Sequence, residues 1–312
     1  MTDTWKYTGP IFDAHTHIWQ PEDVQKLVEI EEEFGIAAQV GIVHDPGFKE
    51  VGEKYPGRFV FAKYLSMQDI AASNTRAVLD DISKIRDEGY SLAKMWFGPR
   101  WIDYVKDVPP DFRIDDARLG PIFSALEDSR LPLLLHVADP DTYFMNQYKD
   151  SEKYGTKEEH LEQLQNLLSQ HPRLKFQLAH MASQPEPNRL SRLAEWLDRF
   201  RNVVLDTASS RWMARELSKD PDASRAFVLK YSTRILFGTD ISTNGGSHEY
   251  YSGRYEAQRI LWESSERHTP LPIPDPDTKD SGGTFINGLD LPESALKKLY
   301  WENAHAFYGL HS

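Results

Sequence analysis

Short apolar runs alternate along the chain with longer stretches in which apolar residues recur every three or four positions. A short apolar run is typical of a buried strand, and the longer spacing is that of a helix packed on one face. We predict strands at residues 10–14, 37–43, 58–65, 90–96, 132–136, 175–180, 203–206 and 235–238. We predict helices at residues 24–34, 74–87, 118–129, 160–170, 190–200 and 223–231, with a closing helix pair at 291–310.

This alternation predicts an α/β protein whose parallel sheet closes into a (β/α)8 TIM barrel. A chain of 312 residues fits one such barrel, so we predict a single domain over residues 1–312. The connection between the second and third strands is short for a helix and two loops, and it is the least regular unit of the pattern.

Three connections that follow predicted strands are long, at residues 97–117, 137–159 and 239–291. The last contains a further helix candidate at residues 255–266 and is rich in Gly, Pro, Ser and Asp from 268 to 288. Loops after the strands of a barrel lie at its C-terminal face, where such folds place their chemistry. We therefore expect these long loops to surround a functional site and to determine its substrate.

Composition excludes several classes of function. The formal net charge is −12 without a basic block, which disfavours nucleic acid and anionic membranes as partners. No apolar stretch is long enough to span a membrane, and residues 1–6 lack the pattern of a signal peptide. The chain has no cysteine, so a bound metal would need histidine and carboxylate ligands. We expect a cytoplasmic protein with a small-molecule substrate; a homodimer would be common for this class of barrel.

Histidine and aspartate stand at the ends of several predicted strands. His15 and His17 follow the first strand, and since side chains alternate along a strand, both imidazoles should leave the same face. The fifth, sixth and eighth strands end at His136, His180 and Asp240. Imidazole and carboxylate are ligands of zinc, which lowers the pKa of a water from about 15.7 to about 7. We therefore predict that these five residues form a metal site at the mouth of the barrel.

Other residues near this mouth are candidates for contacts with a substrate. Lys94, at the end of the fourth strand, has three interpretations: a partner of Asp13 or another carboxylate, a cation for an anionic substrate group, or a carbamylated bridge between two metals. Trp96, Arg100 and Arg211 lie on or beside loops after strands, and arginine suits bidentate binding of a carboxylate.

Four residues are candidates for supporting roles. Asp206 comes directly after the seventh strand and is placed to orient a metal ligand. Asp13 lies two residues before the first histidine and should share its strand face. His44 follows the second strand and is a candidate for lining the pocket. Trp212, on or beside a later loop, is a candidate for holding a carboxylate or an aromatic ring of the substrate.

These residues resemble the motifs of the amidohydrolase superfamily, and within it the amidohydrolase-2 branch of metal-dependent barrel hydrolases and decarboxylases. The resemblance covers nearly the whole chain and is specific for the superfamily, although it does not specify a substrate. Its clearest segments are residues 13–17, 178–180, 237–240 and 299–307.

The resemblance implies roles for individual residues. It implies that His15, His17, His136 and Asp240 bind one divalent metal, most often zinc, with manganese as an alternative and no second metal. It implies that His180 is either a further ligand or a catalytic group beside the metal. It also implies that Asp240 accepts the proton of an activated water in the hydrolases of the superfamily.

Three functions remain open at this point. The first is hydrolysis of a lactone, ester or amide, with Asp240 moving the proton and His180 or Lys94 stabilising the oxyanion. The second is nonoxidative decarboxylation of a small aromatic or enoic acid, in which Arg100 or Arg211 would hold the substrate. The third is a barrel that only binds its ligand, without catalysis.

Overall fold

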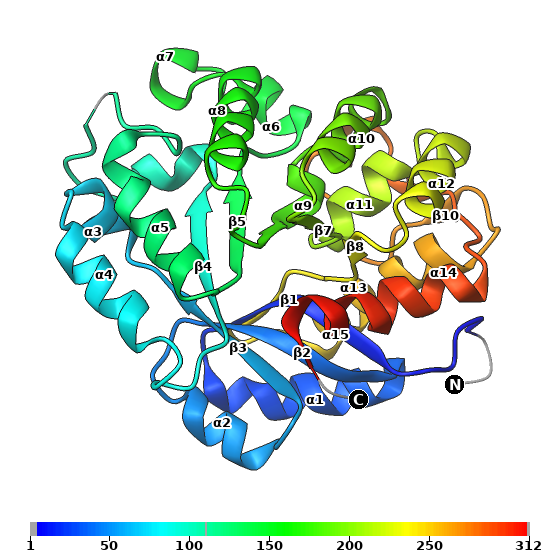
Figure 1. Cartoon of the computed structure of the whole chain (residues 1–312). Coiled ribbons are helices and arrows are strands. Elements are labelled where there is room, and N and C mark those ends of the chain that lie inside the picture. The colour runs from blue at the N-terminus through cyan, green and yellow to red at the C-terminus, as the bar shows by residue number, and fades with distance from the viewer. Residues whose placement is uncertain (1–4, 110, 311–312) are drawn as a thin grey trace.

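The computed structural model of the protein describes residues 5–109 and 111–310 (Figure 1). Its main element is a nine-stranded sheet in the order β8-β7-β6-β5-β4-β3-β2-β1-β9, in which all neighbouring strands are parallel. The strands are β1 (Ile11–Ile18), β2 (Ile36–Val43), β3 (Phe59–Tyr64), β4 (Leu92–Phe97), β5 (Leu133–Val137), β6 (Phe176–Leu178), β7 (Val203–Asp206), β8 (Ile235–Leu236) and β9 (Ile241–Thr243). The prediction of an α/β fold with a parallel sheet is confirmed.

The two ends of the sheet are joined by a very short segment of chain. β8 and β9 stand at opposite ends of the strand order, yet only residues 237–240 separate them. This segment lies beside β1: the Ala14 N–H donates to the Phe237 carbonyl (2.8 Å), and the Asp240 N–H donates to the His15 carbonyl (2.9 Å). The sheet therefore curls until its eighth predicted strand, split into β8 and β9, lies between β7 and β1.

Helices surround the curled sheet on its outer side (Figure 1). Those that follow successive strands are α1 (Val24–Phe34), α2 (Phe48–Lys54), α3 (Met67–Ala71), α4 (Thr75–Lys84), α5 (Gly120–Asp128), α8 (Lys157–Gln170), α10 (Leu190–Arg199) and α12 (Pro221–Lys230). The irregular unit between β2 and β3 does contain a helix, the short α2. Within residues 5–109 and 111–310, no helix has the length and apolar character that crossing a membrane requires.

The inner face of the sheet has its own apolar core. Phe12, Val40, Leu134 and Leu236 come from strands that are not all neighbours, yet they pack in one buried cluster. Phe307 of α15 (Asn303–Tyr308) belongs to the same cluster. α15 thus packs against the concave side of the sheet, whereas the buried residues of α14 (Glu293–Lys297) pack in the larger cluster outside it.

The three long connections contain elements of their own. Residues 97–117 include the short 3-10 helices Pro99–Asp103 and Ala117–Leu119, and residues 137–159 include α6 (Asp141–Asn146) and α7 (Ser151–Tyr154). Residues 239–291 contain α13 (His248–Glu263) and an antiparallel pair, β10 (Thr269–Pro270) with β11 (Phe285–Ile286). The remaining α-helices of the described residues are α9 (Ala179–Ala182) and α11 (Ser210–Leu217), neither of which the apolar pattern predicted.

Candidate metal centre and substrate cavity

A β-bulge within β1 lies next to the first two histidines. Asp13 pairs with Gln39 of β2, but Thr16 pairs with Gly41, so the register shifts between them. The shift interrupts the alternation of side chains. Asp13 therefore does not share the face of His15: its carboxylate accepts a hydrogen bond from the Thr239 hydroxyl (2.5 Å) and does not line the cavity. The expectation that Asp13 points into the site is wrong for this reason.

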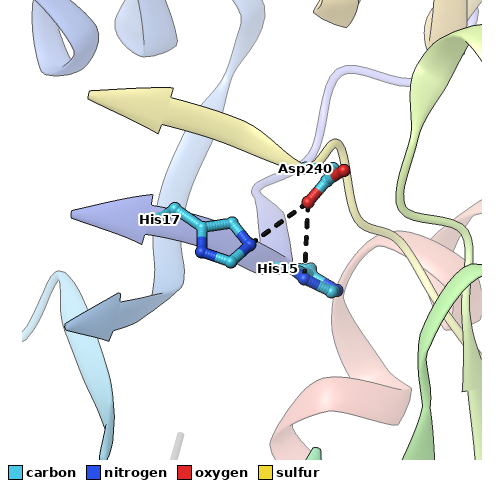
Figure 2. A group of neighbouring side chains, drawn as sticks. All are labelled: His15, His17 and Asp240. Carbon is cyan, nitrogen blue, oxygen red and sulfur yellow. Dashed lines mark ion pairs between the residues drawn. The ribbon is translucent and has the colours of Figure 1, made fainter. Parts of the chain in front are cut away.

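His15, His17 and Asp240 form a compact group with ligand atoms within 4.8 Å of one another (Figure 2). Oδ1 of Asp240 lies 3.5 Å from Nε2 of His15 and 3.3 Å from Nε2 of His17. Nε2 of His15 is buried and has no hydrogen-bond partner among the described residues. Two imidazoles and a carboxylate are a donor set that suits a divalent metal ion. The lack of a partner at Nε2 of His15 is explained if that atom binds such an ion.

Asp206 orients two of the histidines. Its Oδ2 lies 2.9 Å from Nδ1 of His15, which leaves Nε2 of that ring facing the group of three. Its Oδ1 accepts a hydrogen bond from the backbone N–H of His180 (2.8 Å). Burial acts to raise the pKa of Asp206, but the charge and hydrogen bond of His15 outweigh it and hold the pKa well below its usual range. An ionised Asp206 thus supports the ring from behind, as expected for a carboxylate that orients a ligand.

His136 and His180 form a pair beside this group. Nε2 of His180 lies 3.2 Å from Nδ1 of His136, while Nε2 of His136 lies 3.0 Å from Oδ1 of Asp139. Asp139 also accepts a hydrogen bond from the Tyr148 hydroxyl (2.6 Å). Nδ1 of His180 is buried without a partner in the described chain, and burial together with His136 lowers the pKa of His180 to about 3. His180 is therefore a neutral imidazole at pH 7.

A left-handed turn places His180. The predicted strand at 175–180 ends at Leu178, and His180, Met181, Ala182 and Ser183 then have φ of 57°, 53°, 53° and 55°. Each such residue costs about 1–2 kcal/mol relative to the right-handed conformation. The Asp206 carboxylate binds the first residue of the turn, and the Ser183 hydroxyl donates to the Ala138 carbonyl (2.9 Å). Strain of this kind is concentrated at functional sites.

The group of three opens into a cavity of about 560 Å³ at the C-terminal ends of the strands. All five predicted metal ligands line it, together with Lys94 and Trp96. The full lining is His15, His17, Trp19, His44, Tyr64, Lys94, Trp96, Tyr104, His136, His180, Trp212 and Asp240. Trp19, Tyr64 and Tyr104 were not predicted, although Trp19 and Tyr64 share the signal that identified the histidines, a position at a strand end.

The two predicted arginines do not line this cavity. Arg100 is exposed and donates to the Tyr104 hydroxyl (2.8 Å) at the rim. Arg211 donates to the Tyr143 hydroxyl (3.2 Å) and lies 3.6 Å from the Asp275 carboxylate. Among the described residues that line the cavity, none is an arginine.

Lys94 is the buried cation of the cavity. Its side chain is only 2% exposed, and burial lowers its pKa to about 8 even though Asp206 and Asp240 act in the opposite direction. Its Nζ makes no hydrogen bond or ion pair with a residue that the structure describes, so the interpretation as a partner of Asp13 does not hold. The ammonium is available to a bound anion.

A family model places this chain in one family, and similar solved structures share its fold. Residues 103–310 match the family model described as Amidohydrolase. Similar structures include a 2,6-dihydroxybenzoate decarboxylase complexed with 2,6-dihydroxybenzoate, at 15% identity and a TM-score of 0.59 over 97% of this chain and 99% of that chain. The 5-carboxyvanillate decarboxylase LigW from Sphingomonas paucimobilis has 13% identity and a TM-score of 0.56 over 97% and 100%.

A further similar structure is described as an amidohydrolase II, with 12% identity and a TM-score of 0.57 over 96% of this chain and 99% of that chain. No curated protein matches the sequence. At these identities the likeness shows a shared fold.

Proposed function

Because the chain belongs to the amidohydrolase family, we propose that it is a metal-dependent decarboxylase of a small hydroxylated aromatic acid. One observation carries this proposal: the cavity beside His15, His17 and Asp240 is walled by aromatic rings. These are Trp19, Tyr64, Trp96, Tyr104 and Trp212. Flat rings favour a flat apolar ligand, and Lys94 adds one cation for its carboxylate.

Decarboxylases among the similar structures support this choice, while the structure described as an amidohydrolase II supports hydrolysis as well. Two of the similar structures are named as decarboxylases of 2,6-dihydroxybenzoate and 5-carboxyvanillate, which are both aromatic acids.

We also interpret the curled sheet as one (β/α)8 barrel domain over residues 1–312, with its long loops at the C-terminal face.

We assign one divalent ion to His15, His17 and Asp240, with His136 and His180 as the neighbouring candidates for further ligands. Imidazole and carboxylate suit both zinc and manganese, and a similar decarboxylase structure is described with bound manganese. When bound, the ion would supply positive charge that holds the oxygen atoms of the substrate.

The side chains of the site can move the proton that the reaction requires. Burial acts to raise the pKa of Asp240, but the hydrogen bond from His17 and the neighbouring histidines hold it well below the usual range. An ionised Asp240 can accept the proton of a substrate hydroxyl next to the carboxylate and then return it to the ring. The bond between ring carbon and carboxyl carbon breaks, its electron pair stays on the ring carbon, that carbon takes the proton, and carbon dioxide leaves.

The direct test supplies the purified protein, loaded with zinc or manganese, with a panel of hydroxybenzoates. We expect release of one carbon dioxide for each phenol formed, measured by gas analysis and chromatography. Substrate loss without carbon dioxide, or no turnover with any acid of the panel, would refute decarboxylation.

Hydrolysis of a lactone, ester or amide is the second candidate. The lack of arginine among the described lining residues favours it, since a decarboxylase that relies on arginine to hold its substrate would need one near the metal. Here Asp240 would take the proton of water and pass it to the leaving group, and Lys94 or His180 would stabilise the oxyanion. Turnover of a lactone and ester panel, followed as acid release, would select this reaction, whereas binding without any turnover would indicate a non-catalytic barrel.

Lys94 makes the binding of an anionic substrate depend on pH. Since its pKa is about 8, the ammonium is present at pH 7 and is lost as the pH rises through 8. We expect KM for a carboxylate substrate to rise about tenfold per pH unit above pH 8, because only the protonated fraction pairs with the anion. Lys94→Met should show a high KM already at pH 7 and no such rise. A wild-type KM that stays constant from pH 7 to pH 9.5 would contradict this role.

A further inference from the structure

The two histidines of β1 have different partners behind them. Nδ1 of His15 faces the carboxylate of Asp206, whereas Nδ1 of His17 faces a second imidazole: Nε2 of His44 lies 2.8 Å away. Metal-bound histidines usually have a carboxylate, a backbone carbonyl or a water at this position. In this chain an imidazole takes that place.

His44 is itself held in one orientation. It directly follows β2, and its backbone N–H donates to the Ile18 carbonyl (2.9 Å). Its ring stacks on Trp19, with ring centroids 3.7 Å apart and an angle of 1° between the planes, and lies 5.0 Å from the ring of Tyr64. The stacking also accounts for Trp19, a large apolar side chain that is 49% exposed at the mouth of the site.

The hydrogen bond between the two rings selects a tautomer. A ring nitrogen that binds an ion carries no proton, and Nε2 of His17 is the atom that faces Asp240. The proton of His17 must then be on Nδ1, which donates it to Nε2 of His44. His44 in turn must carry its own proton on Nδ1, so that Nε2 can accept.

We propose that His44 is a positioning residue, fixing the ring and the tautomer of His17 for metal binding through a neutral imidazole clamped by Trp19. The proposal rests on the metal site assigned above. Since His44 and its partner ring are both neutral, this support adds no negative charge to the site, unlike Asp206 behind His15. Removal of such a supporting partner weakens metal affinity about 10–100-fold in known sites.

The experiment compares metal affinity among variants of the metal-free protein. Zn²⁺ is titrated into the wild type, His44→Phe and His44→Gln, and the Kd is measured by calorimetry. Phenylalanine keeps the stacking on Trp19 but cannot accept a hydrogen bond, so we expect Kd to rise about 10–100-fold. The Gln carbonyl can take the place of Nε2, so His44→Gln should recover most of the affinity.

His268→Phe is the matched control. His268 also stacks on an aromatic ring, with its centroid 3.8 Å from that of Phe285, but it is exposed and lies on the loop between α13 and β10. The Kd of the His268→Phe protein for Zn²⁺ should equal that of the wild type. If His44→Phe binds Zn²⁺ as tightly as the wild type, the positioning role is refuted. If the wild type itself binds no Zn²⁺, the proposed metal site is refuted instead.

A second measurement does not depend on the folding of a variant. Nitrogen-15 NMR of the Zn²⁺-loaded wild type reports which ring nitrogen of each histidine carries a proton. We expect His44 with a proton on Nδ1 and a hydrogen-bonded, unprotonated Nε2. The opposite tautomer of His44 would overturn the proposal.

Discussion

Asp240→Asn should reduce turnover by about 10²–10⁴-fold, the range expected when a group that transfers a proton is removed. Asparagine keeps the shape of the side chain, but it cannot take up a proton. It also removes the negative charge that lies 3.5 Å from His15 and 3.3 Å from His17. The measurement is kcat on the substrate found in the panel, together with the Kd for Zn²⁺ of the metal-free variant.

Asp198→Asn provides the control for this substitution. Asp198 lies on α10, its side chain is 60% exposed, and it pairs only across 3.5 Å with Lys230, so the same chemical change there should leave kcat unaltered. An Asp240→Asn protein that keeps its metal and full activity would show that Asp240 does not transfer the proton in either proposed reaction.

Arg215→Met is the change with the largest expected effect on stability. Arg215 is nearly fully buried in α11, and its guanidinium donates to the carboxylates of Glu216 (2.7 Å), Asp275 (3.0 Å) and Asp277 (2.8 Å) and to the Thr142 hydroxyl (2.9 Å). Methionine fills much of the volume but leaves buried carboxylates without their cation. Breaking a buried ion pair in this way costs about 3–5 kcal/mol, so we expect the free energy of unfolding in urea to fall by that amount.

The network around Arg215 also holds the site together. It ties α11, which carries the cavity residue Trp212, to α6 and to the segment between β10 and β11. Arg173→Met is the control, because its side chain is 76% exposed and its ion pairs with Glu127 and Asp128 should contribute only about 0–1 kcal/mol. Equal losses of stability in the two variants would refute the special role of Arg215.

The apolar pattern predicted most strands and surrounding helices, because burial determines both the short apolar runs of strands and the three- to four-residue spacing of helices. The seventh strand was predicted at residues 203–206 and the first helix at 24–34, as β7 and α1 are found. Helix α11 was missed because it is only eight residues long and buries charged side chains, Arg215 and Glu216, together with its apolar ones. The helix predicted at 255–266 begins earlier, at His248, where the Ser247 hydroxyl caps its N-terminus.

The sequence allowed us to predict the site residues that stand at strand ends, but not the contacts of the residues elsewhere. The histidines and Asp240 could be predicted to meet because parallel strands end at one edge of a sheet. Asp13 was misplaced because a β-bulge changes the alternation without leaving a sign in the sequence. The directions of the Arg100 and Arg211 side chains could not be predicted, because Arg100 lies on a short 3-10 helix and Arg211 on α11, and the apolar pattern predicted neither helix.

The left-handed turn at residues 180–183 has a consequence for engineering this protein. Valine, isoleucine and threonine do not tolerate such φ values, whereas glycine and asparagine do, so a mutant library at these positions would contain few folded members. The loops at 97–117 and 137–159 carry no comparable run of left-handed residues in their described parts. Directed evolution of a new substrate specificity should therefore vary those loops and leave residues 180–183, including His180, unchanged.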